Sequence, residues 1–167
     1  MPGRAPLRGA PTRPALLGLA LLLTGCTQDA PAPARATGPV DVAPPPAVSA
    51  QASAICTRLL AALPTSLQSG VVSRPVAGDA QRTAAWGDPA VSLACGTPAP
   101  VDDPRATLVQ VGPGSGGVVT FVVEDVEGGT AFTTSGLPVP VTVTVPDAYD
   151  STLLVPLTGP LLEIDRA

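Results

Sequence analysis

The stretch around which the fold is organised reads Trp86-Gly87-Asp88-Pro89-Ala90-Val91-Ser92-Leu93-Ala94-Cys95-Gly96. It holds the only Trp of the chain, a tight-turn sequence, a short alternating pattern and a cysteine. Asp before Pro disfavours the α region and Pro presets its own φ, so residues 87–89 are expected to form a rigid turn. The alternation that follows is typical of a half-buried strand, and the residues before the turn can form its partner. The residues assigned to this motif are Trp86, Gly87, Asp88, Pro89 and Gly96.

Composition and charge limit what the chain can bind. Its 167 residues include 13 acidic and 9 basic side chains, every one of the latter Arg, and no His. Three Arg precede position 14, so the rest of the chain has 6 Arg against 13 acidic side chains and a net charge of −7. An acidic, Lys-free body with one Trp lacks the cation clusters and stacking surfaces of a nucleic-acid partner. The length suits one domain of ordinary size.

The first residues have the pattern of an export signal. Residues 1–25 contain a basic segment and the apolar run 15–23, which is too short for a transmembrane helix of about 20 residues. The sequence Leu23-Thr24-Gly25-Cys26 resembles a bacterial lipobox, so residues 1–25 are interpreted as a lipoprotein signal peptide and Cys26 as the lipidated N-terminus. The alternative is an ordinary signal peptide in which Cys26 is incidental. We expect an extracytoplasmic protein anchored to the membrane by lipid.

The next segment changes composition. Residues 26–50 are rich in Pro and Ala, including Pro44-Pro45-Pro46, so we expect an extended, solvated tether. The alternative, which is less favoured, is that a partner protein that recognises proline binds this segment. Residues 51–167 are expected to form a single globular domain.

Within that domain, apolar periodicity predicts a helix over residues 50–63, capped by Ser49 or Ser53 and ended by Pro64. Period-2 runs predict strands at 107–111, 118–123, 130–134 and 139–145. Because Pro140 has no N–H, that end of its strand is expected at a sheet edge. A C-terminal helix is expected to begin near Pro156.

This order predicts an α+β fold: a small, mostly antiparallel sheet with an N-terminal and a C-terminal helix packed on it. The glycine-rich residues 112–117 lack the Lys and following helix of a phosphate loop, so they are interpreted as a hairpin loop.

Cys56 and Cys95 form an even pair in an exported chain, which favours a disulfide. Two Cys without His make a poor metal site, and no imidazole is available to activate a nucleophilic thiol. We therefore expect the turn at Asp88 to direct Trp86 into the core and Cys95 toward Cys56. This structural role is favoured over an active site.

The missing His also excludes Ser-His-Asp and Cys-His catalysis. Two acidic clusters, Asp102-Asp103 and Glu124-Asp125-Glu127, lie beside turns, where solvated charge is the favoured interpretation over a glycosidase pair or a calcium site. We expect no cofactor, no metal and no catalytic residue.

Several motifs together resemble one family: the lipobox, the Leu-Pro-x-x-Leu of residues 63–67, the block 86–96 and the Val-Pro-x-x-Tyr of residues 145–149. Through these motifs the chain resembles the actinobacterial lipoproteins that contain domain of unknown function 3515. The resemblance implies a small exported envelope protein with no assigned activity.

The expected function is therefore a non-enzymatic module of the cell envelope that binds an envelope protein or a cell-wall component, or has a structural role. The alternative is a cell-wall enzyme, or enzyme accessory, that uses carboxylates.

Overall fold

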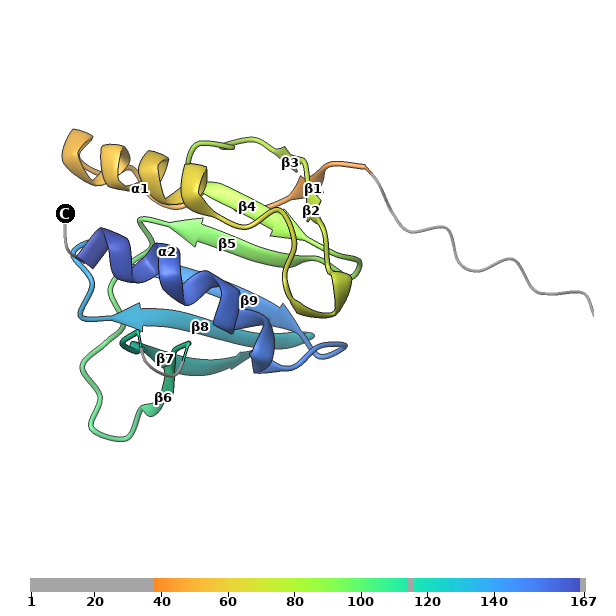
Figure 1. The fold of residues 1–167 in the computed structure, drawn as a ribbon. Coiled ribbons are helices and arrows are strands. Elements are labelled where there is room, and N and C mark those ends of the chain that lie inside the picture. The colour runs from red at the N-terminus through yellow and green to blue at the C-terminus, as the bar shows by residue number, and fades with distance from the viewer. Residues whose placement is uncertain (1–37, 114–115, 166–167) are drawn as a thin grey trace, which may run out of the picture. The chain divides into compact units, whose positions relative to one another are not determined.

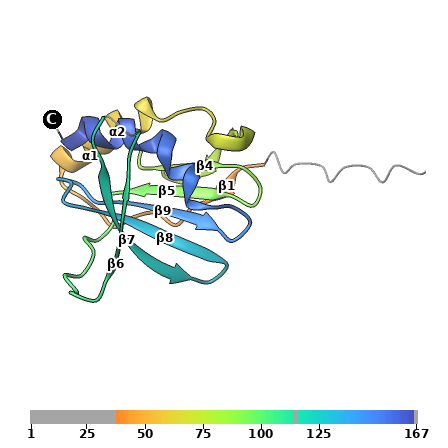
Figure 2. The same ribbon diagram turned by 60° about the horizontal axis from the view of Figure 1, so that its bottom comes forward.

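The computed structural model describes residues 38–113 and 116–165. Within these ranges, two α-helices lie on one face of a seven-stranded sheet (Figures 1 and 2). The helices are α1 (Ala50–Ala62) and α2 (Val155–Asp165), and the 3₁₀ turns are η1 (Gln68–Gly70) and η2 (Ser151–Leu154). The strands are β1 (Val40–Asp41), β2 (Ser73–Arg74), β3 (Val76–Ala77), β4 (Thr83–Trp86), β5 (Val91–Cys95), β6 (Thr107–Val111), β7 (Val119–Val126), β8 (Gly129–Ser135) and β9 (Val141–Pro146).

The seven strands lie in the order β2-β4-β5-β9-β8-β7-β6, and every neighbouring pair is antiparallel. A separate parallel pair joins β1 to β3. This architecture confirms the predicted α+β fold with a mostly antiparallel sheet. The connection from β5 to β6 carries the chain past three strands to the far edge of the sheet. Its residues 97–101 lie beside the face of the sheet that the helices leave uncovered.

Strand β9 is the centre of the sheet, because β5 and β8 flank it on both sides. Val141, Val143 and Val145 are buried on the helix-covered face, as their period-2 spacing predicts. The expectation that Pro140 marks a sheet edge is wrong. Pro140 precedes the first residue of the strand, so the ladder requires no N–H from it, and its carbonyl oxygen accepts a hydrogen bond from Gly96 N at 2.8 Å.

The two helices begin in different ways. The side chain of Ser49 accepts a hydrogen bond from Ala52 N, which makes Ser49 the N-cap of α1. Helix α2 begins at Val155, next to the predicted start, and Pro156 occupies its first turn, where a missing N–H breaks no helical hydrogen bond. The helix continues through Pro160 because Leu157, Leu161 and Ile164 bury its inner face against the sheet.

The boundary expected at residue 51 differs from the one the structure has. From Gly38 onward the chain is extended, as expected of a tether, but it packs on the domain through β1 and through Val42, which is only 7% exposed. Arg74 and Arg82 donate hydrogen bonds to backbone carbonyl groups of this stretch. Residues 38–48, which we call the strap, are therefore part of the folded domain.

Candidate binding groove

Within the motif at residues 86–96, Trp86 and Gly87 pack in the core of the domain. Trp86 is 1% exposed, and its indole N–H donates a hydrogen bond to the carbonyl oxygen of Pro64 at 2.9 Å. Gly87 has a φ of +74°, and a Cβ at this position would lie 2.7 Å from Val71 Cγ1 and 2.8 Å from Tyr149 Oη. Only glycine combines this conformation with this close packing. The turn that follows contains a cis peptide bond between Asp88 and Pro89.

The predicted pair Cys56 and Cys95 forms a disulfide, with the Cα atoms 5.6 Å apart. It joins the middle of α1 to the last residue of β5, and both cysteines are fully buried. Gly96 follows with a φ of +86° and turns the chain away from the sheet, and a Cβ there would lie 2.8 Å from Val48 Cγ1 of the strap. The motif therefore connects the helix, the sheet and the strap.

The face of the sheet opposite the helices holds an open groove of about 540 Å³. Its floor is made of four adjacent strands. Three of them supply small and hydroxyl side chains, namely Ser92 and Ala94, Thr142 and Thr144, and Ala131 and Thr133, and β7 supplies the carboxylate of Glu124. These residues share one face because each alternates with a core residue along its strand.

The groove has two irregular walls rich in Pro and Ala. One is residues 41–45 of the strap, and the other is residues 97–101 of the β5–β6 connection. The hydroxyl of Thr142 donates a hydrogen bond to Thr97 Oγ1 at 2.9 Å and lies 2.9 Å from Thr133 Oγ1, so a short hydroxyl chain links the floor to the second wall.

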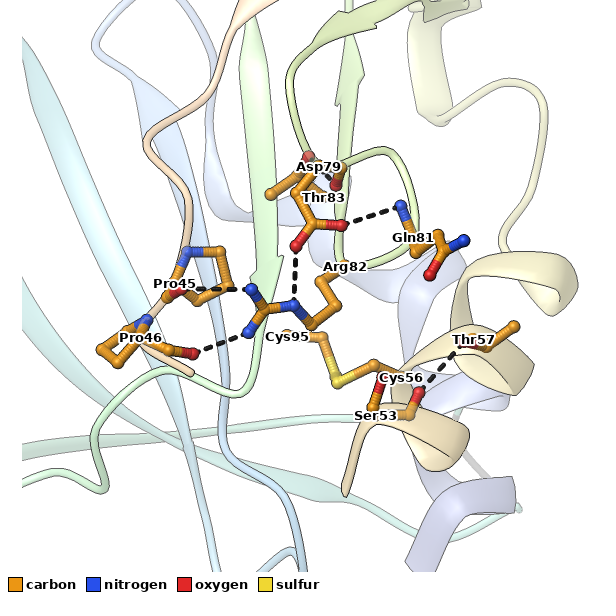
Figure 3. A network of polar contacts seen from close by, with 10 residues as sticks. All are labelled: Pro45, Pro46, Ser53, Cys56, Thr57, Asp79, Gln81, Arg82, Thr83 and Cys95. Carbon is orange, nitrogen blue, oxygen red and sulfur yellow. Dashed lines mark hydrogen bonds and ion pairs between the residues drawn. A yellow bond between two sulfur atoms is a disulfide. The ribbon is translucent and has the colours of Figure 1, made fainter. Parts of the chain in front are cut away.

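Arg82 holds the first wall in place (Figure 3). Its guanidinium donates hydrogen bonds to the carbonyl oxygens of Pro46 at 2.6 Å and Pro45 at 3.3 Å, while Asp79 Oδ2 accepts from Nε at 2.7 Å. The backbone of Arg82 accepts a hydrogen bond from Cys95 N at 2.8 Å. One arginine thus connects the wall of the groove to the strand that carries the disulfide.

The charged groups of the groove are two carboxylates, Asp41 and Glu124, both exposed. Asp102 and Asp103 lie in the β5–β6 connection, Glu124 and Asp125 lie near the end of β7, and Glu127 lies in the turn between β7 and β8, all exposed to water. Within the described ranges no group of three or more potential ligand side chains could hold a metal ion. Nor does any helix there have the length and apolarity to cross a bilayer.

Sequence reasoning located the motif and the disulfide but not the groove. Its floor could have been inferred from the polar positions of the strands at 139–145 and 130–134, which must share the face opposite the core. The strap gave no such signal, because Pro-rich residues with no apolar periodicity do not indicate what they pack on. Cys26 lies outside the described residues.

The fold and its groove define a disulfide-linked α+β domain with an open site on the sheet face that the helices leave uncovered. The chain belongs to the family described as Protein of unknown function (DUF3515), which matches residues 14–164. The resemblance inferred from the motifs is thereby confirmed at the level of the family. No curated protein and no solved structure matches the chain.

Proposed function

We propose that this protein is an exported lipoprotein, anchored through Cys26, whose domain acts as a non-enzymatic binding module of the cell envelope. The observation that carries the binding role is the open groove, walled by proline and floored by hydroxyl groups. Its shape and lining suit an uncharged or weakly cationic segment of an envelope protein or cell-wall polymer. The anchor rests on the lipobox sequence that ends at Cys26.

The chemistry of the groove favours binding over catalysis. The hydroxyl of Thr142 bonds to those of Thr97 and Thr133, and within the described residues none of these three hydroxyls is hydrogen-bonded to a carboxylate that would activate it. A carboxyl that acts as a catalytic acid depends on burial or on a close partner, whereas Asp41 and Glu124 are exposed.

A carboxylate enzyme is the second candidate, because Asp41 and Glu124 line the same groove. The variant Asp41→Asn with Glu124→Gln separates the two functions. A binding module with an uncharged partner keeps that partner in this variant, and one with a weakly cationic partner binds it more weakly, whereas an enzyme that depends on the carboxylates loses its activity.

The anchor is tested by fractionation of cells that express the wild-type chain or Cys26→Ser. We expect the wild type in the membrane fraction, labelled by radioactive fatty acid, and Cys26→Ser unlabelled in the soluble fraction. Thr27→Ser, which leaves the lipobox unchanged, is the control. Membrane retention and labelling of Cys26→Ser would refute lipid anchoring at this residue.

The groove is tested by crosslinking in intact cells from a photoreactive residue placed at Thr144, on its floor. The control position is Gln51, exposed on α1 and away from the groove. We expect a discrete adduct from position 144 that is absent from position 51 and reduced in the Cys26→Ser background. Equal adducts from both positions would rule out the groove as the binding site.

A further inference from the structure

The two edges of the seven-stranded sheet differ in how they are protected. At one edge, β2 has only two residues, one of them Arg74, and Pro75 follows it directly. Short strands, charges and prolines are the usual devices that prevent an edge from pairing with another chain. At the other edge, β6 has five residues, Thr-Leu-Val-Gln-Val, with no charge and no proline. Strand β6 therefore lacks each of these protections.

The side chains of β6 are also suited to contact. Leu108 is 60% exposed and lies opposite Val122 of β7 on the groove side of the sheet. The register places Leu108 at the end of a row that runs across five strands through Ala94, Thr142, Thr133 and Val122. A strand added beside β6 would extend this row and cover the exposed leucine.

The charges around β6 lie at one end of the strand. Thr107 pairs with Val123, so the end of β6 at Thr107 lies beside the exposed Glu124 and Asp125. Asp102 and Asp103 precede the same end in sequence. Arg105 is the single cation in residues 102–125. Residues 38–165 contain four Arg against twelve acidic side chains.

We propose that the β6 edge receives an extended segment of a partner polypeptide as an additional antiparallel strand. The part of the segment that pairs with β6 is uncharged. Basic residues follow it, because an antiparallel strand leaves β6 at the Thr107 end, beside Glu124 and Asp125. Backbone hydrogen bonds supply the pairing, and the charges select the partner and its direction. A second copy of the chain fits less well, because it would bring together two domains of the same strong negative charge.

The test uses the ¹⁵N-labelled full chain in detergent micelles and a synthetic peptide, acetyl-Thr-Val-Thr-Val-Thr-Lys-Lys-amide. We expect saturable amide shifts concentrated in residues 107–111. A peptide with Glu-Glu in place of Lys-Lys should bind at least about tenfold more weakly, as should one N-methylated at all five strand residues.

A matched pair of variants locates the site. Leu108→Lys should weaken binding of the Lys-Lys peptide several-fold, whereas Gln51→Lys, which adds the same charge on α1, should leave it unchanged. Thr144→Trp, which fills the groove, should also leave it unchanged, so this result does not depend on the function proposed for the groove.

Three outcomes would overturn the proposal. Equal affinity of the N-methylated peptide would mean that charge alone attracts it. Shifts in β6 that depend on protein concentration without peptide would assign the edge to a second copy. Absence of saturable shifts in β6 at about 1 mM peptide, where even weak strand addition is measurable, would leave the edge without this role.

Discussion

Arg82 and Pro46 are 36 residues apart in the chain, and Arg82 Nη1 donates a hydrogen bond to the carbonyl oxygen of Pro46 at 2.6 Å. The arginine side chain is 16% exposed, so water screens this charge-assisted bond only partly. Proline carbonyls of an extended segment have no helix or sheet partner of their own, which leaves them available to a distant donor. This bond turns a segment with the composition of a linker into a wall of the groove.

Replacing Arg82 by Ala should release the strap before it unfolds the domain. The loss of three side-chain hydrogen bonds should lower the free energy of unfolding by about 1–3 kcal/mol. Limited proteolysis should then cut within residues 38–48 faster than in the wild type. Arg58→Ala removes the same charge from an exposed position on α1 and is the control. Equal cleavage rates in both variants would show that Arg82 does not hold the strap.

Removing the disulfide should have a larger effect on stability. Cys56 and Cys95 are 39 residues apart, for which loop-closure entropy alone predicts a loss of about 4 kcal/mol. Urea denaturation of Cys56→Ala with Cys95→Ala should shift to a lower midpoint, and reductant should shift the wild type in the same direction. Reductant should have no effect on the double variant. A wild-type midpoint that reductant leaves unchanged would contradict a stabilising disulfide.

The strands were predictable because their signal is a local periodicity, and the disulfide was predictable because its signal is the number of cysteines. Val141, Val143 and Val145 alternate with threonines whichever strands lie beside them, and Cys56 and Cys95 are the cysteines left once Cys26 is assigned to lipid. Both signals can be read from a single sequence, because neither depends on which segments lie beside each other in the fold.

The position of β9 in the sheet and the packing of the strap depend on partners far away in sequence. Pro140 indicated an edge because a missing N–H is usually tolerated there, but the strand begins one residue later. The two arginines bind the strap through carbonyl groups, which every residue has, so its composition could not identify Arg74 and Arg82 as donors. The groove follows from both features and could not be predicted without them.

Trp86→Phe should destabilise the domain although it keeps an aromatic ring in the core. The substitution removes the indole N–H and leaves the carbonyl oxygen of Pro64 without that donor, at a cost of about 1–3 kcal/mol. Circular dichroism should follow the unfolding, because Trp86 is the only Trp and its fluorescence is lost. The variant Phe132→Leu, in the same core, provides a comparison without loss of a hydrogen bond. Unchanged stability of Trp86→Phe would mean that the hydrogen bond to Pro64 contributes little.

Asp150 should make stability depend on pH in the acidic range. Its carboxylate accepts hydrogen bonds from the Thr152 hydroxyl and, at 2.8 Å, from Thr152 N, and these bonds lower the pKa of Asp150 below its ordinary value. Because the folded pKa lies below the unfolded one, the stabilisation is fully present above the unfolded pKa and is lost as pH falls through the folded pKa. Carboxyl NMR titration should find this low value and an increase in Thr152→Val. An identical pKa in both proteins would contradict a role for the hydroxyl.

Thr142→Val should change the groove without unfolding the domain. Valine keeps the β-branched shape in the strand but removes the hydroxyl that bonds to Thr97 and Thr133, so the wall at residues 97–101 loses its link to the floor. We expect faster hydrogen exchange in that wall and a loss of only about 1 kcal/mol in stability. Thr144→Val is the matched control, since Thr144 lines the same groove and its hydroxyl makes no hydrogen bond within the described part of the chain. If both variants exchange alike, the hydroxyl chain does not position the wall, and the shape of the groove depends on the strap and on Arg82 alone.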